Sequence, residues 1–366
     1  MVSKRFLGRF VLIFVLTLSI CYGVALFDRP QEQVDLQTAP KTDRKATSPK
    51  IDKLPTKGLV RYIGAPNSSF KARFGEPSQS FRSVENITWY QYQPDNDSLL
   101  LVGVNNYDDR ICSLYQFGAF EQTAKLHVGM SMPQLLKLVA LSTDFRLTLN
   151  EQPVQLSLTE ADLVKRPLLT FKNGSYAICY FEAGKIKAIQ YLDKNELLRS
   201  QTYKVRSKTP LPVRYSGMIT WEDEQIALEQ STFELLSFER KQGIFIESEA
   251  AEQVATRVIT TLSQAPKKYL SEKQAKRYQR LENERFADTK SLFLMPKEIA
   301  PKLLKDAGVD QNEYEVYLGM PVLDPAQLAV ASTGKEQTFW QGIVTSKSEY
   351  LGLKYDHGLL VVVLEK

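Results

Sequence analysis

Residues 168–192 read LLTFKNGSYAICYFEAGKIKAIQYL, and this stretch decides the fold of the first half of the chain. Asn173-Gly174 and Ala183-Gly184-Lys185 are turn sequences typical of tight hairpins. They separate three apolar segments, each with the length of a strand: 168–171, 176–181 and 186–192. The stretch therefore predicts an antiparallel meander of three strands.

A similar order of elements occurs about 65 residues upstream. Gly64 and Gly129 each precede a stretch with helical spacing of apolar residues, the second with Pro133 near its first turn. Strand-like segments follow the first helical stretch at 89–92, 99–104 and 111–117. The pattern predicts two copies of a helix-then-meander unit, which together form a strand-rich domain at 58–206.

Beyond residue 207 the spacing of apolar residues changes to that of amphipathic helices. Helices are expected at 220–241, 248–262 and 296–307, and two closing strands at 350–353 and 359–364. The chain is therefore expected to be α+β, with a second, helix-rich domain at 216–366.

The composition bounds the classes of protein that this chain can belong to. Its 366 residues are enough for about two domains of roughly 150 residues each. With 43% hydrophobic and 24% charged residues, the chain is neither wholly disordered nor a multi-span membrane protein. A net charge of +5 excludes a dedicated nucleic-acid binder, and 2 His and 3 Cys argue against histidine-rich zinc sites and disulfide scaffolds.

The N-terminus predicts export. Lys4, Arg5 and Arg9 precede an uncharged apolar run at 10–27, which as a helix would be about 27 Å long, close to the thickness of a bilayer core. We expect 1–27 to be a membrane anchor with a cytoplasmic basic flank, so that the domains that follow are extracellular. A cleaved signal peptide, or a lipoprotein acylated at Cys21, are the alternatives. Residues 28–57 contain few large apolar residues and predict a disordered linker.

Two cysteines lie in the exported part, each within a strand-like segment. Export permits a disulfide between Cys112 and Cys179, and buried thiols are equally compatible with their apolar surroundings. The sequence leaves both states open.

The first half resembles the N-terminal domain found beside CAP (cysteine-rich secretory, SCP-like) domains in surface proteins of Gram-positive bacteria. The resemblance rests on a series of motifs in order: Ile63-Gly64, Phe74-Gly75-Glu76-Pro77, Trp89 to Tyr92, Gly103-Val104, Leu158-Thr159-Glu160-Ala161-Asp162-Leu163, Arg166-Pro167-Leu168, Gly184-Lys185 and Leu192-Asp193. It implies that a CAP-like α-β-α sandwich follows.

The second half is similar to a degenerate CAP domain. Residues 235–243 resemble the first helix of the family, with Ser237 in place of its asparagine and Arg240 retained. Further matches, in order, are 285–289, 306–309, 314–316, 332–336 and 351–355.

The cleft of the family holds a divalent metal between two histidines and two acids. The resemblance places Asp288 and Lys335 at the histidine positions and Glu315 at one acid, so these three are the candidate ligand-cleft residues. Because a lysine ammonium repels a cation, we expect neither a metal nor a cofactor there. His127 and His357 lie in turn sequences, and no catalytic motif of another class is present, so an enzyme is not favoured.

A basic stretch at 267–285 suggests a contact surface. Lys276, Arg277 and Arg280 could contact a membrane or a wall polyanion. A solvated helix with internal ion pairs is the alternative.

Together these features predict a single-pass membrane protein that binds a ligand or a protein partner in the Gram-positive cell envelope without catalysis, and that does not bind nucleic acid. Trp89, Tyr90 and Tyr92 could line a groove, although aromatics at strand spacing are typical of a core. The alternatives are a wall-active or proteolytic enzyme that uses Glu315 with Asp288, and a spacer or dimerisation module.

Overall fold

The computed structural model describes residues 52–366 except 84, 121–124, 213–220, 241, 283–292, 295–298, 323 and 332–333. Residues 50–366 form one compact unit. The predicted membrane anchor at 1–27 lies outside the described residues. Within the described part, no helix is long and apolar enough to cross a bilayer.

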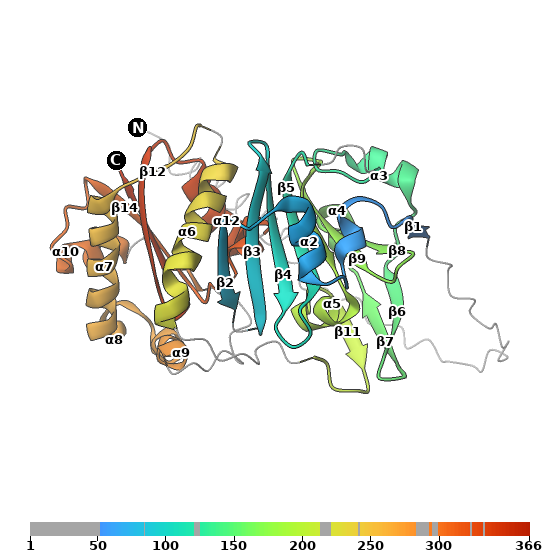
Figure 1. The fold of residues 1–366 in the computed structure, drawn as a ribbon. Helices are drawn as coiled ribbons and strands as arrows, with labels where there is room; N and C mark the ends of the chain where they lie inside the picture. Colours follow the sequence, from blue (N-terminus) through green and yellow to red (C-terminus); the bar gives the residue numbers. More distant parts are fainter. Residues whose placement is uncertain are drawn as a thin grey trace, which may run out of the picture. The chain divides into compact units, whose positions relative to one another are not determined.

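An eight-stranded sheet forms the centre of the first half, in the order β1-β8-β9-β10-β5-β4-β3-β2 (Figure 1). Its strands are β1 (Lys53–Leu54), β2 (Gln79–Ser83), β3 (Ile87–Asp95), β4 (Ser98–Asn105), β5 (Arg110–Gly118), β8 (Leu168–Phe171), β9 (Tyr176–Glu182) and β10 (Lys185–Leu192). The predicted meander is present as β8, β9 and β10. The strand β1 lies within the predicted linker 28–57, pairs with β8 and buries Leu54.

Hydrogen bonds and bulges make the two halves of this sheet equivalent. The amide of Gly64 donates to the Ile111 carbonyl in the first copy, and the amide of Gly129 donates to the Ile186 carbonyl in the second, both at 2.8 Å. Both glycines have a positive φ, which a side chain would disfavour. In each copy one residue bulges after the isoleucine, and β5 and β10 pair antiparallel with Tyr115 opposite Gln190. The structure thus contains the repeat that the sequence suggested, related by a local two-fold axis near this pair.

Both faces of the sheet are buried. One face is covered by η1 (Gly58–Tyr62), α2 (Asn67–Phe74) and α3 (Met132–Leu138). The other face packs against a three-stranded sheet, α5 (Lys194–Ser200) and helices of the second half. The small sheet has the order β11 (Lys204–Ser207), β7 (Gln152–Ser157), β6 (Asp144–Leu149), and the helix α4 (Glu160–Lys165) follows β7 in the chain. Trp89 and Tyr92 are buried on opposite faces, so they are core residues and do not line a groove.

The two cysteines are free thiols buried on opposite faces of the sheet. Cys112 lies on β5 and Cys179 on β9, with β10 between them. Strands two apart are separated by roughly 10 Å, which is beyond the reach of a disulfide. The disulfide that the sequence left open does not form.

The second half is built on a five-stranded sheet in the order β12-β15-β16-β14-β13. The strands are β12 (Ile246–Glu247), β13 (Phe293–Leu294), β14 (Tyr314–Met320), β15 (Tyr350–Asp356) and β16 (Leu359–Glu365). The helices are α6 (Trp221–Glu239), α7 (Glu249–Gln264), α8 (Pro266–Tyr269), α9 (Glu272–Glu282), α10 (Ala300–Asp306), α11 (Pro325–Ala329) and α12 (Gly334–Val344).

The helices α6 and α7 cover opposite faces of this sheet. A Cβ at Gly352 on β15 would lie 2.2 Å from the Glu252 amide, so α7 packs directly on the backbone there. Three residues on, the Tyr355 hydroxyl lies 3.1 Å from Thr232 Oγ1 of α6. Since side chains alternate along a strand, these contacts place the two helices on either face. The expected α-β-α sandwich is confirmed.

A buried charge network joins the two halves. Lys187, the bulged residue of β10, contacts Glu239 of α6 at 2.6 Å and donates to the Ala329 carbonyl of α11 at 2.7 Å. Glu239 also accepts from the Trp340 indole at 3.0 Å. Burial raises the pKa of Glu239, and Lys187 partly offsets this effect. The network therefore fixes α6, α11 and α12 against the larger sheet.

Replacement of Lys187 by methionine should destabilise the protein by about 3–5 kcal/mol near neutral pH, because Glu239 would remain buried without its cation. The loss of free energy of unfolding should be smaller at pH 5 than at pH 8. A carboxyl whose folded pKa lies above its unfolded pKa costs no stability below the unfolded pKa. The cost grows as the pH rises between the two pKa values and is fully present above the folded pKa. Urea unfolding at both pH values measures this. Lys185→Met, at an exposed position of β10, is the control; an equal loss in both variants would contradict the role of the network.

Candidate functional site

A cavity with a volume of about 940 Å³ lies between β14, α10 and α12. Its wall is mostly apolar, with charged groups at a few points. The lining residues are Leu294, Ala300, Pro301, Leu304, Gln311, Asn312, Tyr314, Glu315, Val316, Tyr317, Leu318, Lys335, Thr338, Phe339, Gly342 and Lys366. Two of the three cleft residues that the sequence predicted, Glu315 and Lys335, therefore line one cavity, although they are 20 positions apart. Asp288 lies outside the described residues.

Glu315 is positioned by its neighbour on β14. The Tyr317 hydroxyl lies 2.9 Å from Glu315 Oε1 and 3.1 Å from the Gly342 carbonyl oxygen, and its single proton can be donated to one of them at a time. A Cβ at Gly342 would lie 2.7 Å from the Tyr317 ring, so glycine lets α12 approach this ring closely. Burial and the Glu315 carboxylate raise the pKa of Tyr317, which keeps the phenol protonated.

The cations of the cavity come from two distant segments. Lys335 is exposed in the first turn of α12, and no described acid forms an ion pair with it. Lys366 follows β16 and donates to the Gln311 carbonyl at 2.7 Å. Within the described part of the chain, no group of three or more His, Cys, Asp or Glu residues is arranged to hold a metal ion.

The two histidines lie away from this cavity. His127 Nδ1 lies 2.9 Å from the Val128 carbonyl in the loop before α3, and His357 Nδ1 lies 2.6 Å from Asp356 Oδ1 in the turn before β16. Neither residue is part of the cavity wall.

The predicted basic residues lie on α9. Lys276 and Arg280 are exposed, and Arg277 is half-buried, while Ala275 and Tyr278 of the same helix are buried. Lys276 forms an ion pair with Glu272 one turn earlier, at 2.7 Å. The structure thus shows an amphipathic helix with an internal ion pair, and a contact role for its basic face stays a prediction.

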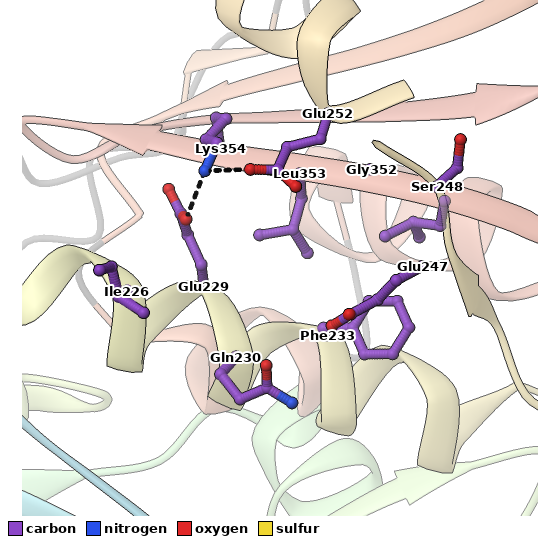
Figure 2. A pocket seen from close by; sticks show the side chains of 11 residues that line it. Ile226, Glu229, Gln230, Phe233, Glu247, Ser248, Glu252, Gly352, Leu353 and Lys354 are labelled. Atoms are coloured by element: carbon purple, nitrogen blue, oxygen red, sulfur yellow. Dashed lines mark hydrogen bonds and ion pairs between the residues drawn. The ribbon is translucent and has the colours of Figure 1, made fainter. Parts of the chain in front are cut away.

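A second, smaller pocket of about 310 Å³ lies beside β15, and Figure 2 shows its side chains. Lys354 points between Glu229 of α6 and Glu252 of α7, at 3.1 and 2.5 Å from their carboxylate oxygens. Burial lowers the pKa of Lys354, but the two glutamates outweigh this effect and raise it overall. Glu229 also accepts the Tyr355 amide at 2.9 Å, so this cluster ties both helices to the strand.

The sequence did not predict the Lys354 cluster. Glu229 and Glu252 lie at helical positions where a glutamate is usually exposed to solvent, so nothing in a single sequence marks their carboxylates as partners of a buried lysine. The one available signal was Lys354 itself, a charge inside the apolar closing strand 350–353 and its continuation. A charge in such a run requires a partner when the strand is buried.

An α-β-α sandwich, joined to an eight-stranded sheet and carrying a cleft that faces β14, defines an SCP-like, two-part architecture. An extracellular protein containing an SCP domain from Bacillus anthracis covers 86% of this chain and 97% of its own length, with a TM-score of 0.62 and 16% identity. A cysteine-rich secretory protein from Staphylococcus aureus has the same coverage, with a TM-score of 0.65 and 14% identity.

Residues 63–203 match the family described as CAP-associated N-terminal. The chain therefore carries a CAP-associated N-terminal domain, followed by a region with the fold of SCP-domain proteins, as the motif series predicted. A Bacillus subtilis relative named "Uncharacterized membrane protein YlbC" is 23% identical over 198 residues, which is 52% of this chain. The match spans 56% of that relative's length.

Replacement of Lys354 by methionine should lower the free energy of unfolding by about 1–3 kcal/mol at neutral pH, because Glu229 would lose its cation in a largely buried setting. A lysine with a raised folded pKa stabilises the protein below its unfolded pKa of about 10.4 and loses this effect as the pH rises through the folded value. The deficit of the variant should therefore persist to about pH 10 and then shrink. Denaturant unfolding from pH 6 to 11 measures it, with Lys347→Met at an exposed position as the control. A deficit that is unchanged at pH 11 would contradict this account.

Proposed function

We propose that this chain is an extracytoplasmic protein of a Gram-positive cell envelope, anchored by its N-terminal apolar segment, and that it binds an amphipathic, anionic ligand in the cavity between β14, α10 and α12 without turnover. The observation that carries the proposal is the combination of a large, mostly apolar wall with two lysines in that cavity. The extracytoplasmic placement is supported by the resemblance to an extracellular SCP-domain protein and to a membrane protein.

The size and lining of the cavity favour an apolar ligand body. A volume of about 940 Å³ is at the upper end of the range of ordinary ligand sites, which is about 300–1,000 Å³. Leu304, Val316, Leu318 and Phe339 provide apolar surface from three elements. An acyl chain or a similar hydrocarbon would gain roughly 25 cal/mol for each Å² of apolar surface that it buries there.

The charges favour an anionic head group. Lys335 and Lys366 contribute two ammonium groups to the wall, against the single carboxylate of Glu315. The Tyr317 hydroxyl donates to Glu315 Oε1, so part of the acceptor capacity of this carboxylate is already used inside the protein. An anionic head group beside Lys335 would therefore meet a cation with which no described acid forms an ion pair.

The same contacts argue against the alternative of a hydrolytic enzyme that uses Glu315. A general base must lie within hydrogen-bond reach of its proton donor and be free to accept the proton. Glu315 Oε1 accepts from the protonated Tyr317 phenol, and neither histidine belongs to the cavity wall, so no histidine assists Glu315 there. A ligand that dissociates unchanged from the protein is the outcome that separates binding from turnover.

The proposal predicts that residues 50–366 bind cis-parinaric acid, an anionic polyene fatty acid that fluoresces in apolar sites. Thr338→Trp should weaken binding at least about tenfold, because an indole at this exposed position of α12 would occupy the cavity. Thr345→Trp, just beyond the end of the same helix and outside the cavity wall, should bind normally. Fluorescence titration measures both.

Lys335→Glu tests the charge contribution and should weaken cis-parinarate binding by about three- to tenfold, since an exposed charge contributes modestly. The neutral analogue, cis-parinaric methyl ester, should be insensitive to this change. Equal binding of the acid by the parent protein and by Thr338→Trp would refute the cavity as the site.

A further inference from the structure

A third pocket lies at the junction of the two halves and is distinct from the cavity of the proposed function. It has a volume of about 300 Å³. The first half contributes residues of β5, β9 and β10, the residue after α4, and the end of α5 with Thr202. The second half contributes residues of α11 and α12, with Val330 and Ala331 between them. The lining residues are Tyr115, Arg166, Tyr180, Gln190, Ser200, Thr202, Gln327, Val330, Ala331 and Glu336.

Two opposite charges face this pocket from the two halves of the chain. Arg166 follows α4 and Glu336 lies in the first turn of α12, and they do not form an ion pair in the structure. Arg166 Nε contacts Asp162 Oδ1 at 2.6 Å, which leaves the two terminal nitrogens of the guanidinium without a hydrogen-bond partner among the described residues. A guanidinium fork of this kind is suited to bidentate binding of a carboxylate.

Arg166 is held in place by Tyr203. The Tyr203 hydroxyl donates to the Arg166 carbonyl at 2.6 Å, and the guanidinium lies over the Tyr203 ring, 5.7 Å from its centroid. Together with the Asp162 contact, these interactions fix the arginine before any ligand arrives. Preorganisation of this kind reduces the entropy that a ligand must overcome.

The floor of the pocket is a set of hydroxyl and amide groups at the local two-fold axis of the larger sheet. Tyr115 lies opposite Gln190 across the β5–β10 pair. Gln190 accepts from the Tyr180 hydroxyl at 2.9 Å and donates to Ser113 Oγ at 3.1 Å. The Tyr115 residue is 1% exposed and lines the pocket.

Burial raises the pKa values of Tyr115 and Tyr180, so both phenols are protonated at neutral pH. Tyr115 therefore offers a hydrogen-bond donor to whatever occupies the pocket.

We propose that this junction pocket binds a small zwitterion of the α-amino acid or dipeptide class, with its carboxylate on Arg166 and its ammonium on Glu336. Tyr115 and Gln190 supply polar contacts between these ends. The volume lies at the lower limit of ligand sites, which suits a molecule of this size. A neutral sugar would leave both charges without a counterion, and a simple anion would face the Glu336 carboxylate.

The direct test is isothermal titration of the full chain in a nonionic detergent with two probes, L-alanine and D-alanyl-D-alanine. At least one should bind with a dissociation constant of millimolar or lower, and the N-acetylated and C-amidated forms of the same probe should each bind at least about tenfold more weakly, since each lacks one charge. Absence of binding by both probes overturns the proposal. Equal binding of the N-acetylated form would show an anion site instead and would equally overturn it.

Variants assign the ends of the ligand. Glu336→Gln should weaken the binding probe at least about tenfold but leave affinity for the N-acetylated form unchanged, because only the ammonium contact is lost. Tyr115→Phe should weaken both forms by a similar factor. Glu349→Gln, at an exposed position outside the pocket wall, is the matched control and should have no effect. A Glu336→Gln variant that folds normally and binds the probe as the parent does would refute the assigned role of Glu336. None of these results depends on cis-parinarate binding, so the two sites are tested independently.

Discussion

The structure depends on one constraint: the eight-stranded sheet is apolar on both faces, and its own domain covers only part of the second face. Leu235 and Leu236 of α6 belong to the same hydrophobic core as Trp89 and Ile178 of the larger sheet. A sheet face of this kind left in water would be an aggregation surface. The CAP-associated domain and the SCP-like region are therefore parts of one compact unit, and the junction pocket has walls that neither half forms alone.

Polar contacts give this shared core its orientation. The amide of Gln91, inside β3, receives a hydrogen bond from Ser231 of α6 at 2.6 Å, and Gln341 of α12 donates to Glu182 of β9 at 2.9 Å. Hydrophobic burial is non-directional, so it would allow α6 to slide along the sheet. Buried hydrogen bonds that must all be satisfied permit one register, which is why such groups are tolerated in an otherwise apolar junction.

The sequence predicted the meander, the repeat and the long helix α6 because each has a local signature in period or turn residues. Its ordered motif series also named Glu315 and Lys335 as cleft residues, and both line one cavity in the structure. It did not predict the small sheet of β6, β7 and β11, nor the junction pocket. Arg166 and Glu336 are 170 positions apart, and nothing local to either residue indicates that the chain brings them together. Such sites arise from tertiary packing, and the spacing of apolar residues predicts local elements but not which distant elements meet.

The matched hydrogen bonds and bulges of the two sheet halves have a consequence for how the halves of the chain are joined. They give the sheet the arrangement of a symmetric pair, with the β5–β10 pairing at its axis. Equivalent positions of the two copies nevertheless carry different residues. The bulged position is Cys112 in the first copy, buried in the core, and Lys187 in the second, where it contacts the SCP-like region. The same backbone bulge therefore places a thiol in the core in one copy and a cation at the junction with the SCP-like region in the other.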